Sequence, residues 1–182
     1  MHKTPRIVGR VSRISLAVAT LALALGASGS FHTPAKAAAP AYVDHTLNMS
    51  SDLRNTATVS HTVPAGDNRL LLVAVMIRAD EWVSSITYGG TSLTLVKVQD
   101  GGTSDDQRVE LWYLAGPSVG AANVVVTFAS YVNPDAIVAV NLTGVDQNDP
   151  IGATDGASAT SGTQATTSIT TLNADSLILG AV

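Results

Sequence analysis

The spacing of hydrophobic and polar residues beyond residue 37 follows the two-residue period of β-strands. Short runs rich in Val, Ile, Thr, Leu and aromatic residues recur along the chain, and Gly, Pro, Asn or Asp separates them. This pattern is typical of an all-β sandwich or barrel, and no helical pattern between the runs points to parallel βαβ units. We therefore expect an antiparallel β-sandwich. The expected strands span residues 42–48, 56–62, 69–77, 83–88, 91–98, 108–114, 123–128, 136–142, 166–171 and 176–182.

Gly89 and Gly90 separate two alternating runs and predict a two-residue hairpin loop. Such a loop needs positive φ angles, which glycine adopts without a Cβ clash. One face of the resulting hairpin is mostly apolar and is expected to pack on the core, with Trp82 and Tyr88 on that side, while the hydroxyl-bearing face meets water. The expected pairs are Tyr88 with Thr91, Thr87 with Ser92, Ile86 with Leu93, Ser85 with Thr94, Ser84 with Leu95, Val83 with Val96 and Trp82 with Lys97.

Two runs are apolar at successive positions, so that both faces of a strand would carry apolar side chains: "LLLVAVMI" at 70–77 and "AIVAVNL" at 136–142. Strands of this kind are covered on both faces, so we expect both to lie centrally in their sheets, with one face under a loop or a neighbouring module. The run 152–168 is small, hydroxylated and almost uncharged, and is expected to form a surface connection.

Residues 1–37 have a different composition. Four basic residues precede an uncharged, mostly apolar run over 14–27, and a small-residue stretch ends in Ala35-Lys36-Ala37. This order is typical of a secretory signal peptide, because the apolar run is shorter than the roughly 18 residues of a membrane-spanning helix. We expect cleavage after Ala37 by the general secretory route, a secreted or cell-surface location, and a single β-sandwich domain over 38–182.

The charge of residues 38–182 limits the partners. This part holds five Lys and Arg against fourteen Asp and Glu, a formal charge of −9. Nucleic acid and anionic lipid surfaces require a basic face, so neither nucleic acid nor membrane insertion is expected. The chain has no cysteine, which excludes disulfides, thiolate metal sites and cysteine nucleophiles.

Four stretches carry a resemblance: "HTVPAGDNRLLLVAV", "VSSITYGGTSLTLV", "VELWYLAGPSVGAANVVVTF" and "AVNLTGVDQNDPIGA". Their order and spacing over 61–182 resemble a family of β-sandwich modules that recur in large secreted or surface proteins of bacteria. The resemblance implies a jelly-roll-like or immunoglobulin-like extracellular sandwich and implies no activity. It also implies that the last strands of such a module lie beyond Val182, where this sequence stops inside an apolar run.

The stretch "GPSVG" at 116–120 fits the G-x-S-x-G nucleophile pattern around Ser118. A nucleophile elbow needs a strand, a strained turn and a helix, followed by an acid and a histidine. Here the five residues lie between two expected strands and no histidine follows His61. A hairpin loop is the better interpretation.

Acidic loops are candidate calcium sites, because calcium takes six to eight oxygen ligands and accepts backbone carbonyls. Asp100, Asp105 and Asp106 lie in one loop, and Asp146 and Asp149 lie in another. Neither has EF-hand spacing, and acidic turn residues commonly form Asx-turns. Calcium at Asp100, Asp105 and Asp106 is therefore a hypothesis beside the simpler one of a turn.

Aromatic residues could form a sugar-binding platform. In "VELWYL" at 109–114, Val109, Leu111 and Tyr113 are expected to face inward, which leaves Glu110 and Trp112 outward. Trp112 is thus the candidate residue for binding an extracellular glycan, with a lid over the core or a contact to another domain as alternatives.

The histidines His45 and His61 are sixteen residues apart on different expected strands, and a zinc site would require both to converge with carboxylates. Solvated or hydrogen-bonded histidine is the simpler interpretation. Glu81 and Glu110 are the only glutamates, and no spacing places two acids across a cleft for glycoside hydrolysis.

These patterns favour a non-catalytic extracellular module for adhesion, spacing or weak carbohydrate binding, whose partners are neighbouring modules of a longer chain or an extracellular glycan. An exported polysaccharide hydrolase or its accessory module, and a structural appendage component that assembles through sheet edges, are the alternatives. A pocket of convergent polar groups, exposed aromatic residues and unpaired apolar edges would distinguish the three.

Overall fold

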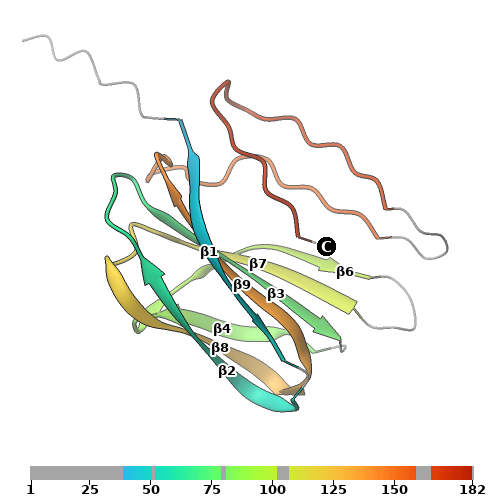
Figure 1. The fold of residues 1–182 in the computed structure, drawn as a ribbon. Helices are drawn as coiled ribbons and strands as arrows, with labels where there is room; N and C mark the ends of the chain where they lie inside the picture. Colours follow the sequence, from blue (N-terminus) through green and yellow to red (C-terminus); the bar gives the residue numbers. More distant parts are fainter. Residues whose placement is uncertain (1–38, 51, 79–80, 102–106, 159–164, 182) are drawn as a thin grey trace, which may run out of the picture. The chain divides into compact units, whose positions relative to one another are not determined.

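The computed structural model describes residues 39–181, except 51, 79–80, 102–106 and 159–164. The expected signal peptide, 1–37, lies outside the described residues. The described residues belong to one compact unit and contain nine strands and no helix, which confirms the all-β prediction (Figure 1). The strands are β1 (Ala41–Met49), β2 (Arg54–Val63), β3 (Leu70–Arg78), β4 (Val83–Tyr88), β5 (Thr91–Ser92), β6 (Thr94–Asp100), β7 (Gln107–Ala115), β8 (Gly120–Val132) and β9 (Pro134–Thr143).

The strands form two antiparallel sheets. One has the order β1-β9-β3-β7-β6 and the other the order β2-β8-β4-β5. The main core cluster contains side chains of both sheets, for example Val73 and Val75 of β3 with Val124 and Val126 of β8. Because the two inner faces share one core, the architecture is a β-sandwich.

The strands β3 and β9 lie inside the five-stranded sheet, as their apolar sequences predict. β3 pairs with both β7 and β9, and β9 pairs with both β3 and β1. Every residue of β3 from Leu70 to Ile77 is buried or half-buried. Both faces of β3 are therefore largely shielded from solvent, and one of these faces packs in the core.

The turn at Gly89 and Gly90 is confirmed, but the long hairpin is not. Both glycines have positive φ, 55° and 86°, Tyr88 pairs with Thr91 and Thr87 with Ser92. After Leu93, whose N–H donates to the Ile86 carbonyl, the chain leaves the four-stranded sheet.

The continuation, β6, pairs with β7 at the edge of the other sheet. The four pairs expected beyond Leu93, which involve residues 82–85 and 94–97, are therefore wrong. The chain crosses between sheets at Leu93, a single buried residue that lies between the end of β5 and the start of β6.

Two tryptophans face opposite to their predicted directions. Trp82 is 53% exposed rather than in the core, because the register of β4 against β8 shifts between Val83 and Ser85 and turns Val83 inward instead. Trp112 is only 9% exposed and belongs to the core cluster, and Glu110 is 1% exposed. In β7 the inward residues are those predicted to be outward, because three donors satisfy the Glu110 carboxylate and allow it to lie inside.

The two C-terminal strands expected at 166–171 and 176–182 are wrong for the residues that the structure describes. From residue 144 to residue 181 the described chain contains no strand, and the part after residue 150 is drawn as a plain orange-to-red trace in Figure 1. We call residues 150–181 the C-terminal segment, of which 159–164 are not described. No helix in the described part of the chain has the length and hydropathy to span a membrane.

Candidate functional site

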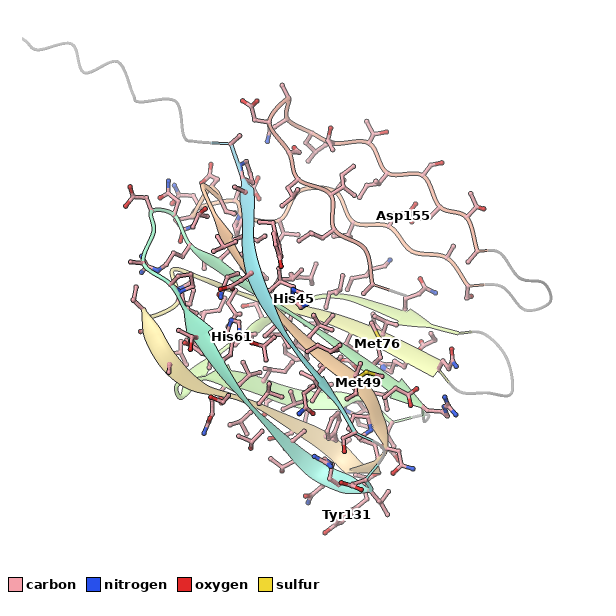
Figure 2. All side chains as sticks on the ribbon, in the orientation of Figure 1. His45, Met49, His61, Met76, Tyr131 and Asp155 are labelled. Atoms are coloured by element: carbon pink, nitrogen blue, oxygen red, sulfur yellow. The ribbon has the colours of Figure 1, made fainter. Side chains whose placement is uncertain are left out.

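The face of the five-stranded sheet that turns away from the core is apolar across four of its strands, β1, β9, β3 and β7. We call it the outer face. The strand register aligns Leu47, Val138, Ala74 and Leu111 in one row across β1, β9, β3 and β7. The next row contains Met49, Ala136, Met76 and Val109, and Figure 2 labels both methionines. A sandwich usually presents polar residues on its outward face, so this apolar outward face departs from the usual pattern.

The C-terminal segment covers one end of the outer face. A second hydrophobic cluster forms there from Leu70, Leu142 and Val145, and Tyr113 and Ile151 pack against it. Between the segment and the sheet lies a cleft of about 390 Å³, which is within the usual size of ligand pockets. Its floor includes Leu70, Leu72, Leu111 and Leu142, and its wall includes Leu172, Leu177 and Leu179. The outer face and this cleft are the candidate site.

Carboxylates gather at the cleft. Asp146, Asp149, Asp155 and Asp175 are among its lining residues, and Lys97 is the one Lys or Arg among them. The lining of the cleft therefore combines aliphatic side chains with a net negative charge. This site was not predicted from the sequence, although the apolar runs at 70–77 and 136–142 indicated that the second face of these strands is covered.

Asp155 connects two parts of the C-terminal segment, the stretch around Gly156 and the stretch around Thr167. The Thr167 hydroxyl donates to one of its carboxylate oxygens, and the Gly156 N–H donates to the other at 2.8 Å. The Thr167 bond, helped by the Gly156 bond, holds the pKa of Asp155 below its ordinary value of 3.8, because both donors favour the charged carboxylate.

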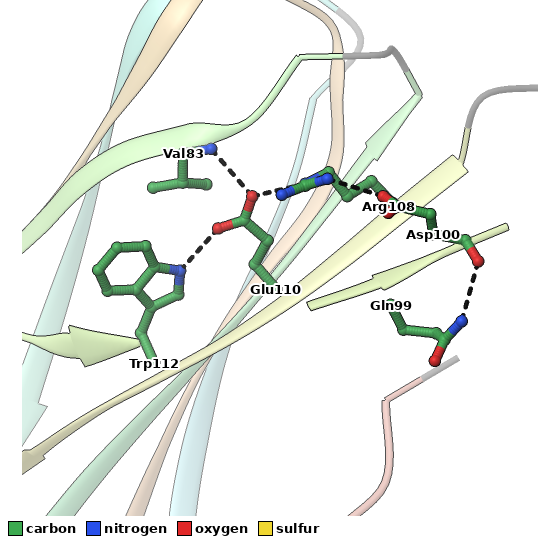
Figure 3. Close-up of polar contacts among 6 residues, drawn as sticks. All are labelled: Val83, Gln99, Asp100, Arg108, Glu110 and Trp112. Atoms are coloured by element: carbon green, nitrogen blue, oxygen red, sulfur yellow. Dashed lines mark hydrogen bonds and ion pairs between the residues drawn. The ribbon is translucent and has the colours of Figure 1, made fainter. Parts of the chain in front are cut away.

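The most buried charge in the described chain belongs to Glu110 of β7 (Figure 3). Its Oε1 accepts from the Val83 N–H at 3.1 Å and from Arg108 Nε at 2.7 Å, and its Oε2 accepts from Trp112 Nε1 at 3.1 Å. Arg108 in turn contacts Asp100 at 2.7 Å. Three donors thus satisfy a carboxylate that would otherwise be costly to bury.

This network has a structural cause. β5 is only two residues long because the chain crosses to the other sheet, so β5 pairs with only the last two residues of β4. The Glu110 carboxylate of the opposite sheet supplies an acceptor for the Val83 N–H. The network therefore fastens the two sheets together. Burial lowers the pKa of Arg108, but the hydrogen bond and charge of Glu110, with Asp100, raise that pKa by more, to above its ordinary value.

The two histidines have separate surroundings (Figure 2). His45 lies on exposed β1, where its Nδ1 and the Tyr42 hydroxyl are 2.7 Å apart. His61 is 2% exposed, and its Nδ1 lies 2.9 Å from Thr46 Oγ1. No group of three or more His, Asp or Glu residues in the described ranges is arranged to hold a metal ion.

Buried polar atoms also lie at the β1 edge. Asn141 Nδ2 donates to Asp44 Oδ1 at 2.6 Å and to the Thr62 carbonyl at 2.8 Å. Among the described residues, Asn141 Oδ1 and His61 Nε2 are buried atoms with no hydrogen-bond partner. These contacts connect β1 of one sheet to β2 of the other.

The predicted calcium ligands are only partly described. Asp105 and Asp106 lie outside the described residues, while Asp100 forms its ion pair with Arg108. Asp146 accepts from the N–H groups of Asn148 and Asp149 at 2.8 and 3.4 Å, as in an Asx-turn. Calcium at Asp100, Asp105 and Asp106 stays a prediction.

Ser118 lies in a connection between sheets. The residues 116–119 join β7 of the five-stranded sheet to β8 of the four-stranded sheet, so the loop is not the hairpin loop that we expected. A strand follows it where a nucleophile elbow has a helix. Trp112, the predicted glycan contact, donates its indole N–H to Glu110 inside the core, so it lacks the exposure on which that prediction depended.

Comparison with known proteins does not identify a relative of the chain. No protein-family model, curated protein or solved structure matches the chain. The class of the protein, an antiparallel β-sandwich, therefore follows from its own strands.

Proposed function

We propose that the chain is a non-catalytic extracellular β-sandwich module that binds a partner through the outer face of its five-stranded sheet. The observation that supports this proposal is the outer face itself. It is apolar across four strands, and the C-terminal segment covers one end and leaves a cleft of about 390 Å³. Leu47 and Met49 of this face are exposed, and apolar surface exposed to solvent marks interaction sites in soluble proteins when it is contiguous.

Two further features agree with a binding role. The inner face of the same sheet is a closed core, so the outer face is not needed to complete the sandwich. The N-terminal 37 residues have the pattern of a secretory signal, which agrees with adhesion outside the cell. The proposal does not include the weak carbohydrate binding that we expected at Trp112, because the Trp112 indole lies in the core.

The test is an array of polysaccharides and peptides probed with the 182-residue chain. Gly152 lines the cleft, and a Cβ added there meets no atom within 4 Å. Gly180 is equally open but does not line the cleft, so Gly180→Trp is the matched control for Gly152→Trp.

We expect a bound array member whose signal falls in Gly152→Trp and persists in Gly180→Trp. Chemical conversion of an array member would overturn the non-catalytic role and favour the hydrolase. Absence of binding to every member would overturn the binding role and leave the spacer role.

A further inference from the structure

The cleft has three features that together define a class of ligand, and the inference below rests on the proposed binding role. The first is the floor, where Leu70, Leu72 and Leu111 present aliphatic side chains from two paired strands. Neighbouring residues on one face of a strand are spaced for alternate side chains of an extended chain. A flat polar sugar ring has no aromatic stacking partner among these three side chains.

The second feature is the charge around the floor. Asp146, Asp149, Asp155 and Asp175 line the cleft against the single cation Lys97. A ligand that places positive charge beside these carboxylates gains attraction and faster association. An anionic ligand would meet repulsion from the same groups.

The third feature is the wall. Among the described residues, Leu177, Ile178, Leu179 and Gly180 form no backbone–backbone hydrogen bond, and the stretch 177–180 has no regular structure. Unpaired backbone N–H and C=O groups in a chain beside a groove can pair with an added strand, which is how many peptides bind to sheets.

We infer that the cleft binds an extended peptide segment in which aliphatic and basic residues alternate. Its aliphatic side chains would pack on the floor, its Lys or Arg side chains would reach the carboxylates, and its backbone would pair with the wall. A second copy of this chain fits less well, because residues 38–182 carry a formal charge of −9 and the apolar run 176–181 contains no basic residue.

The experiment is calorimetric titration of the 182-residue chain with the capped hexapeptide Lys-Val-Lys-Val-Lys-Val. Glu-Val-Glu-Val-Glu-Val and Lys-Ser-Lys-Ser-Lys-Ser separate the contributions of charge and of apolar side chains. The protein variants are Gly152→Trp, Leu111→Lys, which adds a cation on the floor opposite Lys97, and Asp149→Asn. Gly180→Trp is the control, and thermal unfolding establishes that each variant is folded.

We expect only the Lys-Val peptide to bind. Its affinity should fall at least about tenfold in Leu111→Lys or Gly152→Trp and about twofold to fivefold in Asp149→Asn, the range for an exposed ion pair. It should be unchanged in Gly180→Trp.

Four binding results would overturn the inference. They are equal binding of the Glu-Val peptide, equal binding of the Lys-Ser peptide, Lys-Val binding that neither Leu111→Lys nor Gly152→Trp weakens, and no binding of Lys-Val. A dimer in sedimentation that Leu111→Lys dissociates would also overturn it and assign the cleft to a second copy. If an array member binds at the cleft while Lys-Val does not, the inference fails and the proposed binding role stands.

Discussion

Glu110 is the clearest case in which one residue determines how the two sheets meet. Its carboxylate is 1% exposed and accepts from three donors, of which Val83 belongs to the opposite sheet. A buried carboxylate with fewer donors would be strongly unfavourable. The alternation of β7 predicted it outward, since a glutamate beside apolar neighbours is normally solvated.

Replacing Glu110 with Gln should lower the free energy of unfolding by about 1.5–3 kcal/mol, the range for hydrogen bonds to a charged group. The amide offers a donor where the carboxylate accepts, so either Trp112, or Arg108 together with the Val83 N–H, loses its partner. Urea unfolding at neutral pH measures the change.

Asp100→Asn is the matched control for this prediction. Asp100 contacts the same Arg108, but its side chain is 67% exposed, so its loss should cost less than about 1 kcal/mol. Equal destabilisation by the two substitutions would show that burial does not govern the network.

Gly90 tests the backbone of the β4–β5 turn. Its φ is 86° and a Cβ added there meets nothing within 4 Å, so only the backbone conformation opposes a side chain. Gly90→Ala should cost about 1–2 kcal/mol, whereas Gly152→Ala, equally open and without positive φ, should change stability by less than about 0.5 kcal/mol. Thermal and urea unfolding of both variants compare the two, and similar stabilities would contradict the turn geometry.

At the scale of elements, β1 depends on polar contacts more than its sequence indicates. It is an edge strand with most residues exposed, and the bond between Thr46 and His61 connects it to the other sheet. Thr46→Val removes this bond and leaves His61 with a second buried nitrogen lacking a partner, because Nε2 already has none among the described residues.

We expect Thr46→Val to destabilise the chain by about 1–3 kcal/mol and to raise amide hydrogen exchange in β1 above that in β3. Thr46→Ser keeps the hydroxyl and should retain the exchange protection of β1. Equal exchange in the valine and serine variants would mean that the pairing with β9 alone holds β1.

The C-terminal segment should respond to acid through Asp155. Because the pKa of this carboxyl is lowered in the folded chain, its ionised form stabilises the tie to Thr167 above pH 3.8. That contribution is lost as the pH falls through the lowered pKa. Thr167→Val should move the pKa of Asp155 up towards 3.8, as measured by NMR titration of the carboxyl carbon. Thr166→Val is the control, and an equal change in both variants would rule out the Thr167 bond as the cause.

How far the elements could be predicted depended on their neighbours. β3 and β9 were placed correctly because residues apolar at both parities leave no alternative to a central position. The register at Gly89 and Gly90 failed beyond Leu93, since crossing to another sheet depends on long-range pairing with β7. The same limit applies to Trp82 and Trp112, whose directions were set by a register shift and by the donors that allow neighbouring Glu110 to be buried.

At the scale of the whole molecule, the site could be predicted only in outline. The sequence indicated that a loop or neighbouring module covers one face of the central strands, and the C-terminal segment partly does so. The cleft could not be predicted, because it depends on strands expected at 166–171 and 176–182 that do not form among the described residues. Apolar sequence there meets the sheet as an irregular chain, which leaves space that a paired strand would fill.

The sandwich core and the covered outer face should be separable by truncation. The main core cluster ends with Ala139 and contains no residue of the C-terminal segment. A chain without residues 153–182 should therefore still unfold cooperatively, while the outer face around Leu72 and Leu142 loses its cover. Exposed apolar surface of this size binds dyes and drives association, so stronger fluorescence of an apolar dye and concentration-dependent sedimentation are expected.

The same truncation carrying Leu72→Lys distinguishes a specific face from general unfolding. A charge at the centre of the uncovered face should reduce both dye fluorescence and association while the melting transition stays cooperative, since Leu72 is not part of the main core cluster. A truncated chain with no cooperative transition would mean that the C-terminal segment is part of the folding unit. In that case the outer face would be a second core, and the cleft would be a packing defect within it rather than a surface for a partner.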